Sequence, residues 1–176
     1  MTKYLALDAS LTNCGYSIWQ DDTYLLSGQF KPQGKDWIDK IQSVAKWLYT
    51  LSMRHTFDIV FYEKPTGTSG GKFGNKDTDR KLGALWYAVN LFCRLHNIKY
   101  IDVYSSQIKA IGLLKVFDDK KLKVDLEGFE KALRYKPFTL YFHNNGDFNI
   151  AAMNRQNDEI DAIGCGLAGM EKVKNE

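Results

Sequence analysis

KYLALDASLTNCGYSIWQDDTYLLSGQF, residues 3–30, is the stretch that decides the fold. It contains three runs rich in apolar, β-branched and aromatic residues, KYLALDA, GYSIWQ and TYLLSGQF, and this composition is typical of β-strands. Only short polar turns separate the runs, and Asp21 with Asp22 forms the second turn. Three successive strands with such short links predict an antiparallel meander.

Helices and further strands follow the meander. Residues 36–53 place apolar side chains at helical spacing, which predicts an amphipathic helix that packs on the sheet. Residues 57–64, FDIVFYEK, have the length and composition of a buried strand, and Pro65 ends it because proline has no N–H to donate. The pattern then predicts a second helix over residues 78–96 and another strand over residues 99–104.

The last segment, NDEIDAIGCGLAGMEKV (157–173), is predicted to be a helix from the spacing of Ile160, Ile163 and Leu167. Interior glycines in a helix each cost about 1 kcal/mol relative to alanine, and a close approach of this helix to the sheet would compensate. The complete order predicts an α/β, ribonuclease-H-like fold. In that fold a meander of three antiparallel strands is followed by parallel strands in one mixed five-stranded sheet, with helices on both faces.

The composition fits one globular domain, residues 1–176, because 44% of the residues are hydrophobic and can form an ordinary core. No apolar run approaches the roughly 20 residues that a membrane span requires, and the first residues carry no apolar signal-peptide core. The three cysteines are odd in number and outside any C-x-x-C pair, which favours a reduced environment. We therefore expect a cytoplasmic protein with no membrane partner.

Four carboxylates stand out once the elements are placed. Asp8 ends the first predicted strand and Glu63 ends the fourth. If these strands are parallel neighbours, about 4.8 Å apart, both side chains emerge at the same edge of the sheet. Asp158 and Asp161 lie three residues apart on the last helix and share a face. Glu159 falls on a different face and is the weaker candidate.

Such a cluster favours a divalent cation. Four carboxylates together are unfavourable by repulsion and desolvation, whereas Mg²⁺ prefers hard oxygen ligands and is typically held by carboxylates and substrate phosphates. Two such ions about 3.5–4 Å apart form the usual apparatus for phosphodiester hydrolysis. Each acid taken alone also fits an ordinary role as a turn former, a partner of Lys64 or a helix N-terminal acid. Only their coincidence favours a catalytic site.

The motifs that carry these acids resemble those of the RuvC family of Holliday-junction resolvases. LALDASLTNCGYSI is similar to the family's opening strand, IVFYEKP to its second acidic strand, and NDEIDAIGCGLA to its terminal helix. RKLGALWYAV and YSSQIKAIG also fall at the family's usual places, and the divergence elsewhere is more like phage or viral members. The resemblance implies a homodimeric, magnesium-dependent crossover junction endodeoxyribonuclease that cuts four-way or other branched DNA. It also implies that the catalytic metal ligands, for two Mg²⁺ ions or Mn²⁺ in their place, are Asp8, Glu63, Asp158 and Asp161.

Basic residues gather in two stretches, 70–81 and 115–136, although the net charge is only +3. Phosphate contacts depend on clustered Lys and Arg rather than on total charge, so these stretches are candidate DNA surfaces, with a merely solvated surface as the alternative. Phe73 lies between two lysines among glycines, where its ring either stacks on an unpaired base or folds back against the core. Lys109 is a candidate through the resemblance alone. The predicted DNA-binding residues are Lys72, Phe73, Lys76, Arg80, Lys109, Lys120 and Lys121.

Three other functions stay open at this stage. A ribonuclease of the same fold would cut RNA–DNA hybrids or structured RNA. The opening D-x-S-x-x-x also resembles the phosphate loop of actin-like ATPases and sugar kinases, but those enclose a nucleotide between two such domains and 176 residues supply one. A scaffold that only binds nucleic acid would not need all four carboxylates.

Overall fold

The computed structural model describes residues 1–65, 76–110 and 157–175. The predicted meander is confirmed: β1 (Lys3–Ala9) pairs antiparallel with β2 (Cys14–Gln20), which pairs antiparallel with β3 (Thr23–Phe30). Asp21 takes the left-handed conformation, with φ of 50°, in the turn between β2 and β3. Its carboxylate accepts the backbone N–H of Thr2 at 2.8 Å, which ties this turn to the start of β1.

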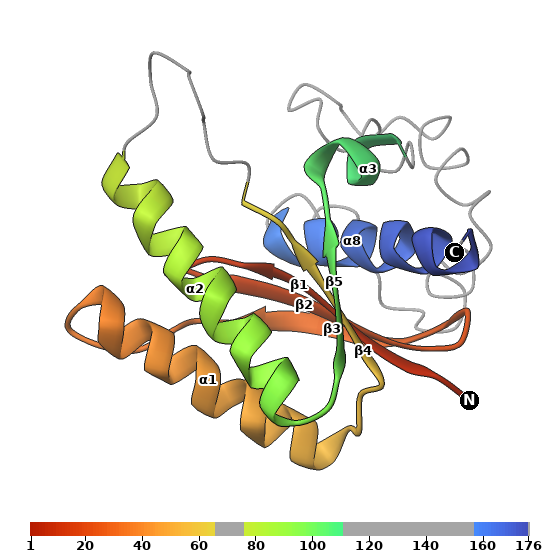
Figure 1. The fold of residues 1–176 in the computed structure, drawn as a ribbon, viewed down its shortest axis with the longest axis horizontal. Helices are drawn as coiled ribbons and strands as arrows, with labels where there is room; N and C mark the ends of the chain where they lie inside the picture. Colours follow the sequence, from red (N-terminus) through yellow and green to blue (C-terminus); the bar gives the residue numbers. More distant parts are fainter. Residues whose placement is uncertain (66–75, 111–156, 176) are drawn as a thin grey trace.

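Two parallel strands complete the sheet, as the pattern predicts. β4 (Ile59–Glu63) pairs parallel with β1 on one side and with β5 (Lys99–Val103) on the other. The strand order is β3-β2-β1-β4-β5, so β1 and β4 occupy the middle of the sheet (Figure 1). Central strands of this kind are covered on both faces, which is why β1 and β4 read as unbroken apolar runs.

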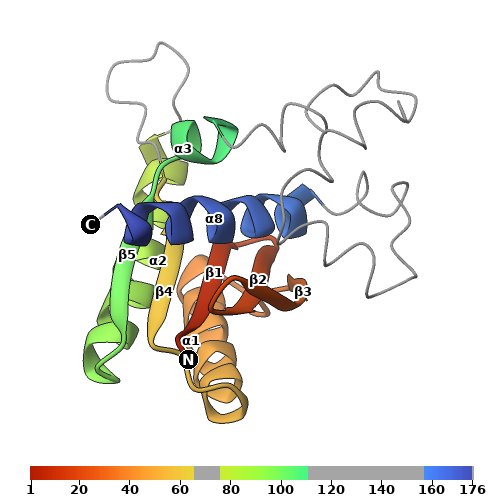
Figure 2. The same ribbon diagram turned by 90° about the vertical axis from the view of Figure 1, so that its right-hand side faces the viewer.

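Helices cover both faces of the sheet. α1 (Trp37–Arg54) and α2 (Lys76–Leu95) lie on one face, and α8 (Asn157–Lys174) crosses the other (Figures 1 and 2). The carboxylate of Asp36 caps α1 by accepting two backbone N–H groups of its first turn. A short helix, α3 (Ser105–Ala110), follows β5. No helix in the described part of the chain is both long and apolar enough to cross a membrane.

Alternate side chains of each strand enter opposite cores, because successive residues of a strand point to opposite faces. On β1, Leu5 and Leu7 are buried in the core beneath α1 and α2, whereas Ala6 is buried in the core beneath α8. On β4, Val60 and Tyr62 belong to the first core. Phe61 belongs to the second, and this alternation sets the direction of the acids that end both strands.

The glycines of α8 allow the predicted close approach to the sheet. A Cβ on Gly166 would clash with the Trp19 ring of β2, and a Cβ on Gly169 would clash with the Phe61 ring of β4. A buried polar link reinforces the contact, since Ser17 Oγ donates to the carbonyl of Ala162 at 2.8 Å. α8 therefore lies directly on the sheet, with its first turn near the carboxyl end of β1.

Candidate active site

The ends of β1 and β4 bring Asp8 and Glu63 side by side. Leu7 is paired in register with Tyr62, so Asp8 and Glu63 are the next residues along two adjacent parallel strands. Leu7 and Tyr62 both enter the core beneath α1 and α2. Because side chains alternate, Asp8 and Glu63 both point to the opposite face, where α8 lies.

The first turn of α8 carries Asp158 and Asp161 to the same place. Asp8 pairs with Gly15 on β2, and a Cβ on Gly15 would clash with the backbone carbonyl of Asp158. The backbone of Asp158 therefore lies against the residue of β2 that pairs with Asp8. Asp161 follows one turn later on the helix, and the structure thus gathers acids from three distant parts of the chain.

Asp8 interacts electrostatically with the other three acids. Burial, followed by the negative charges of Glu63, Asp161 and Asp158 in that order, raises the pKa of Asp8 from 3.8 to about 8. The pKa of the buried Cys165 thiol is also raised, first by burial and then by Glu63 and Asp8. Without a cation, Asp8 therefore holds a proton at neutral pH.

The donor set suits a divalent metal by its chemistry, although within residues 1–65, 76–110 and 157–175 no three His, Cys, Asp or Glu side chains are arranged to hold a metal ion. All four candidate ligands are hard oxygen donors of the kind that Mg²⁺ and Mn²⁺ prefer. Asp8 retains its proton because it is buried and because three negative charges surround it, and a cation there would relieve the repulsion. The chemistry of these four carboxylates therefore suits the Mg²⁺ or Mn²⁺ ions that the sequence predicts.

Comparison with known proteins identifies the architecture. No family model matches the chain, and no curated protein sequence matches it either. Among solved structures, RuvC of Thermus thermophilus in complex with a Holliday junction substrate superposes with a TM-score of 0.54 at 13% identity, covering 83% of this chain and 97% of RuvC. The fold is that of RuvC.

Two other solved structures support this assignment. T. thermophilus RuvC alone gives a TM-score of 0.52 at 13% identity, over 82% of this chain and 97% of that chain. The yeast mitochondrial Holliday junction resolvase Ydc2 gives 0.60 at 14% identity, over 96% of this chain and 78% of Ydc2. The predicted ribonuclease-H-like sheet and the resemblance to RuvC are both confirmed at the level of the fold.

On this RuvC fold, the turn between β1 and β2 adds a residue that sequence reasoning missed. Asn13 donates its side-chain amide to Asp158 Oδ2 at 2.5 Å. The neighbouring acid on α8, Glu159, is turned away from the cluster and accepts a hydrogen bond from Ser27 of β3. This arrangement agrees with the expectation that Glu159 falls on a different face from Asp158 and Asp161.

Only two of the predicted DNA-binding side chains lie in the described part of the chain. Lys76 is exposed at the start of α2. Arg80 is not free, because its guanidinium pairs with Asp77 at 2.8 Å and lies 5.9 Å from the centre of the Trp37 ring. Lys109 belongs to α3, but its side chain is outside the described set. The other predicted residues outside that set are Lys72, Phe73, Lys120 and Lys121.

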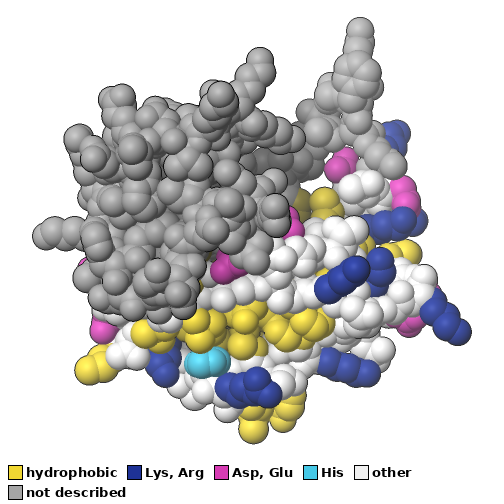
Figure 3. All heavy atoms as spheres, turned by 180° about the vertical axis from the view of Figure 1, so that it is seen from behind, with side chains coloured by type: hydrophobic (Ala, Val, Ile, Leu, Met, Phe, Trp, Pro, Cys, Tyr) yellow, Lys and Arg dark blue, Asp and Glu magenta, His cyan; other side chains and the backbone are white. Residues whose placement is uncertain are grey.

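Charge on the described surface gives no single basic patch on the face seen from behind. Figure 3 shows Lys and Arg side chains dispersed over this face around a band of hydrophobic side chains. Aspartates also neutralise basic residues elsewhere, since Asp77 pairs with Lys81 as well as with Arg80. A DNA surface built from these residues stays a prediction.

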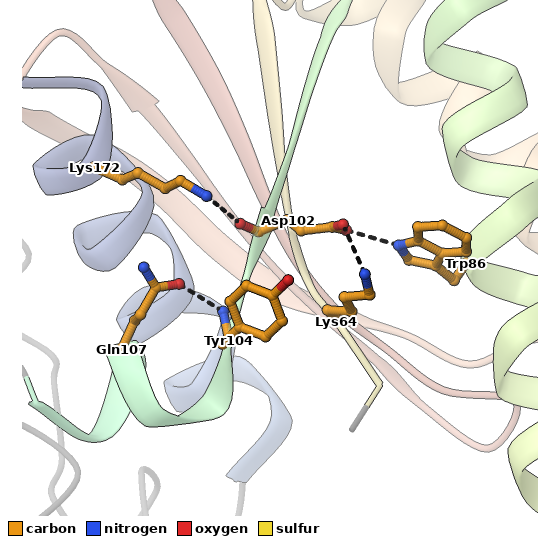
Figure 4. Close-up of polar contacts among 6 residues, drawn as sticks. All are labelled: Lys64, Trp86, Asp102, Tyr104, Gln107 and Lys172. Carbon is orange, nitrogen blue, oxygen red and sulfur yellow. Dashed lines mark hydrogen bonds and ion pairs between the residues drawn. The ribbon is translucent and has the colours of Figure 1, made fainter. Parts of the chain in front are cut away.

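Lys64, the residue after Glu63, is held in a polar cluster on the α2 side of the sheet (Figure 4). Its ammonium lies 3.4 Å from Asp102 Oδ2 and 5.2 Å from the centre of the Trp86 ring. Trp86 Nε1 donates to the other carboxylate oxygen of Asp102 at 2.7 Å, and Lys172 Nζ donates to the Asp102 carbonyl at 3.2 Å. Asp102 therefore joins β4, α2 and α8 beside the candidate site.

Replacing Asp102 with alanine is expected to lower the free energy of unfolding by about 1–3 kcal/mol, the range for leaving partly buried hydrogen-bonding groups without a partner. The Trp86 indole N–H and the Lys64 ammonium both lose an acceptor. Urea unfolding of wild type and variant measures the difference. Asp22→Ala is the matched control, because Asp22 pairs with Lys174 in the open, and it should unfold like wild type. Equal stability of Asp102→Ala and wild type would contradict this assignment.

Proposed function

We propose that the chain is a divalent-metal-dependent endonuclease that cuts four-way or other branched DNA, and that residues 1–176 act as one RuvC-like nuclease domain. The observation that carries the proposal is the placement of the acids: Asp8 and Glu63 end adjacent parallel strands, and the turn of α8 that carries Asp158 lies against Gly15, the partner of Asp8 on β2. Asp8 and Glu63 lie at the carboxyl ends of central parallel strands, where α/β sheets bind ligands. The solved structure of RuvC with a Holliday junction supports the choice of substrate.

Asp8, Glu63, Asp158 and Asp161 would hold Mg²⁺, or Mn²⁺ in its place, with two ions in each active site. When bound, the metal supplies Lewis-acid stabilisation of charge on the scissile phosphate and activation of water. The chain's own contribution is to collect the ligands on rigid elements. β1 and β4 fix Asp8 and Glu63, and α8 is fixed to the sheet by its close glycine contacts.

The homodimer of the proposal would use the outer face of α2. Tyr87, Leu91 and Leu95 are 70%, 56% and 72% exposed and lie at four-residue intervals along this helix. A row of large apolar side chains is a contact surface rather than scattered exposure. A second copy related by a two-fold axis would place two active sites on opposing strands of a four-way junction.

The variant Leu91→Glu is expected to convert a dimer into a monomer, because it places a charge in the middle of the contact row. Sedimentation velocity of wild type and variant at equal concentration measures the change. Thr50→Glu, an exposed position on α1, is the matched control and should stay dimeric. Wild-type protein that sediments as a monomer at all concentrations would contradict the dimer.

A cleavage assay tests the activity itself. The purified chain is incubated with a synthetic four-way DNA junction, linear duplex DNA or an RNA–DNA hybrid, in Mg²⁺ or in EDTA. We expect paired symmetric nicks in the junction with Mg²⁺ and none with EDTA. Cleavage of the hybrid alone would show a ribonuclease instead, and ATP turnover without cleavage would show an actin-like ATPase.

Metal affinity is expected to rise with pH and to level off above about pH 8, where Asp8 has lost its proton. The sign follows from the raised pKa: below it, each bound metal must displace the Asp8 proton, so affinity falls by up to about tenfold per pH unit. Mn²⁺ titrations between pH 6 and 9 measure this dependence. Affinity that is constant over this range would contradict a role for Asp8 as a ligand.

A further inference from the structure

We propose that Asn13 is a positioning residue for the metal site, which fixes the orientation of the Asp158 carboxylate through its side-chain amide. The inference rests on the proposed function, because it needs Asp158 to be a metal ligand. Its evidence is independent, since it comes from the turn between β1 and β2 rather than from the acids. Ligating carboxylates are commonly held by such hydrogen bonds, and these bonds tune metal affinity.

Hydrogen bonds with the Ser10 side chain hold the backbone of Asn13 in place. Ser10 Oγ accepts a hydrogen bond from the backbone N–H of Asn13 at 3.0 Å. The same hydroxyl donates a hydrogen bond to the backbone carbonyl of Asn13 at 2.6 Å. The same hydroxyl lies 3.0 Å from Thr12 Oγ1. One serine thus fixes both backbone groups of Asn13 in a turn that begins two residues after Asp8. The side-chain amide of Asn13 therefore extends from a backbone that Ser10 holds in place.

The chemistry of the contact suits a metal ligand. The amide engages Asp158 Oδ2 only, so this contact does not use Oδ1. A neutral donor orients the carboxylate without cancelling its charge, whereas a lysine at this position would compete with the cation for the same negative group. The turn next to Asp8 thereby links two acids that lie 150 residues apart in the chain.

The hydrogen bond between Asn13 and Asp158 also holds α8 against the sheet. The neighbouring hydrogen bond between Ser27 and Glu159 allows this structural role to be tested apart from a role in metal binding. The Ser27 hydroxyl donates a hydrogen bond to Glu159, which lies on the same helical turn as Asp158. It also accepts a hydrogen bond from the Tyr24 hydroxyl at 2.7 Å. Glu159 is not among the charges that raise the pKa of Asp8. Removing Ser27 therefore removes a tie between α8 and the sheet without touching the acid group.

Mn²⁺ binding to the full chain, followed by water-proton relaxation, tests the inference without any need for cleavage. Asn13→Ala is expected to weaken Mn²⁺ binding by about 10-fold to 100-fold, the usual range for loss of a bond that supports a ligand. In an Asp158→Ala background the same change should cause no further loss, because the residue acts through Asp158. Ser27→Ala should lower the melting temperature but leave Mn²⁺ affinity unchanged.

The outcomes distinguish failure of the role proposed for Asn13 from failure of the proposed nuclease function. Wild-type affinity in Asn13→Ala, or losses that add in the double variant, would overturn the role of Asn13 and leave the proposed function standing. A wild-type chain that binds no Mn²⁺ would overturn both. Metal binding that depends on Asn13 in a chain that cuts no branched DNA would support this inference while removing the proposed function.

Discussion

Asp8→Asn is expected to lower cleavage of a four-way junction by about 10²–10³-fold or more, the loss expected when a group that stabilises transition-state charge is removed. Asp8 lies beside Glu63 at the end of β1, and its pKa is raised by burial and then by Glu63, Asp161 and Asp158. In Ca²⁺, which displaces the Asp8 proton, the change removes a negative charge near the substrate's phosphates, so junction binding should persist. Single-turnover cleavage and a gel-shift titration in Ca²⁺ measure the two effects separately.

The same variant is expected to be more stable than wild type when metal is absent and the pH is high. The folded pKa of Asp8, about 8, lies above its ordinary value of 3.8, so the folded protein binds this proton more tightly than the unfolded chain. The contribution of Asp8 to stability is therefore complete below about pH 4 and is lost as pH rises towards 8, by at most about 1.4 kcal/mol per pH unit. The side chain in Asp8→Asn does not titrate, so the variant lacks this loss of stability as the pH rises.

Melting temperatures in EDTA at pH 5 and pH 9 check this prediction. Wild type should lose stability between the two pH values, and Asp8→Asn should lose less. Glu159→Gln is the matched control for both experiments, because Glu159 is the neighbour of Asp158 on α8 but bonds to Ser27 and does not raise the pKa of Asp8. A wild-type rate of cleavage in Asp8→Asn would remove Asp8 from the mechanism, and an equal loss of stability in both proteins would contradict its buried, proton-holding state.

Gly15→Ala is the second change with a large expected effect, because its Cβ would clash with backbone atoms of Asp158. A backbone neighbour cannot rotate away, so we expect destabilisation at or above the upper end of the usual overpacking range, about 3 kcal/mol. If the chain still folds, the first turn of α8 must shift away from β2. That shift separates Asp158 from Asp8 and should abolish cleavage.

Gly83→Ala is the matched control for this prediction. Gly83 lies inside α2, and a Cβ there meets no heavy atom within 4 Å. Alanine in a helix is more favourable than glycine by about 1 kcal/mol, so this variant should be more stable and equally active. Urea unfolding and junction cleavage of both variants test the comparison, and a Gly15→Ala protein as stable and active as wild type would show that α8 does not lie against β2.

Local periodicity made most of the fold predictable. β1 and β3 match the predicted runs KYLALDA and TYLLSGQF residue for residue, because alternation and turn residues define them within the sequence. The adjacency of Asp8 and Glu63 was also predictable from the sequence, because the last side chains of two neighbouring parallel strands lie at the same edge of the sheet. The assignment of roles to these acids is a separate matter, and it stays a proposal.

Contacts between distant, aperiodic residues were not predictable in the same way. Asn13 lies in a polar turn with no pattern to distinguish it, and its contact with Asp158 depends on where α8 crosses the sheet. The pairing of Lys64 with Asp102 likewise requires the strand order. By contrast, the pairing of Arg80 with Asp77 is a three-residue helical spacing that the sequence displays, and it lessens the charge that Arg80 offers to DNA.

Anomalous diffraction from crystals of the chain grown with Mn²⁺ tests the central claim most directly. We expect anomalous peaks between the ends of β1 and β4 and the first turn of α8, within coordination distance of Asp8 and Glu63 and of at least one of Asp158 and Asp161. Crystals saturated with Mn²⁺ that show no peak at these carboxylates, or show peaks only elsewhere, would contradict it.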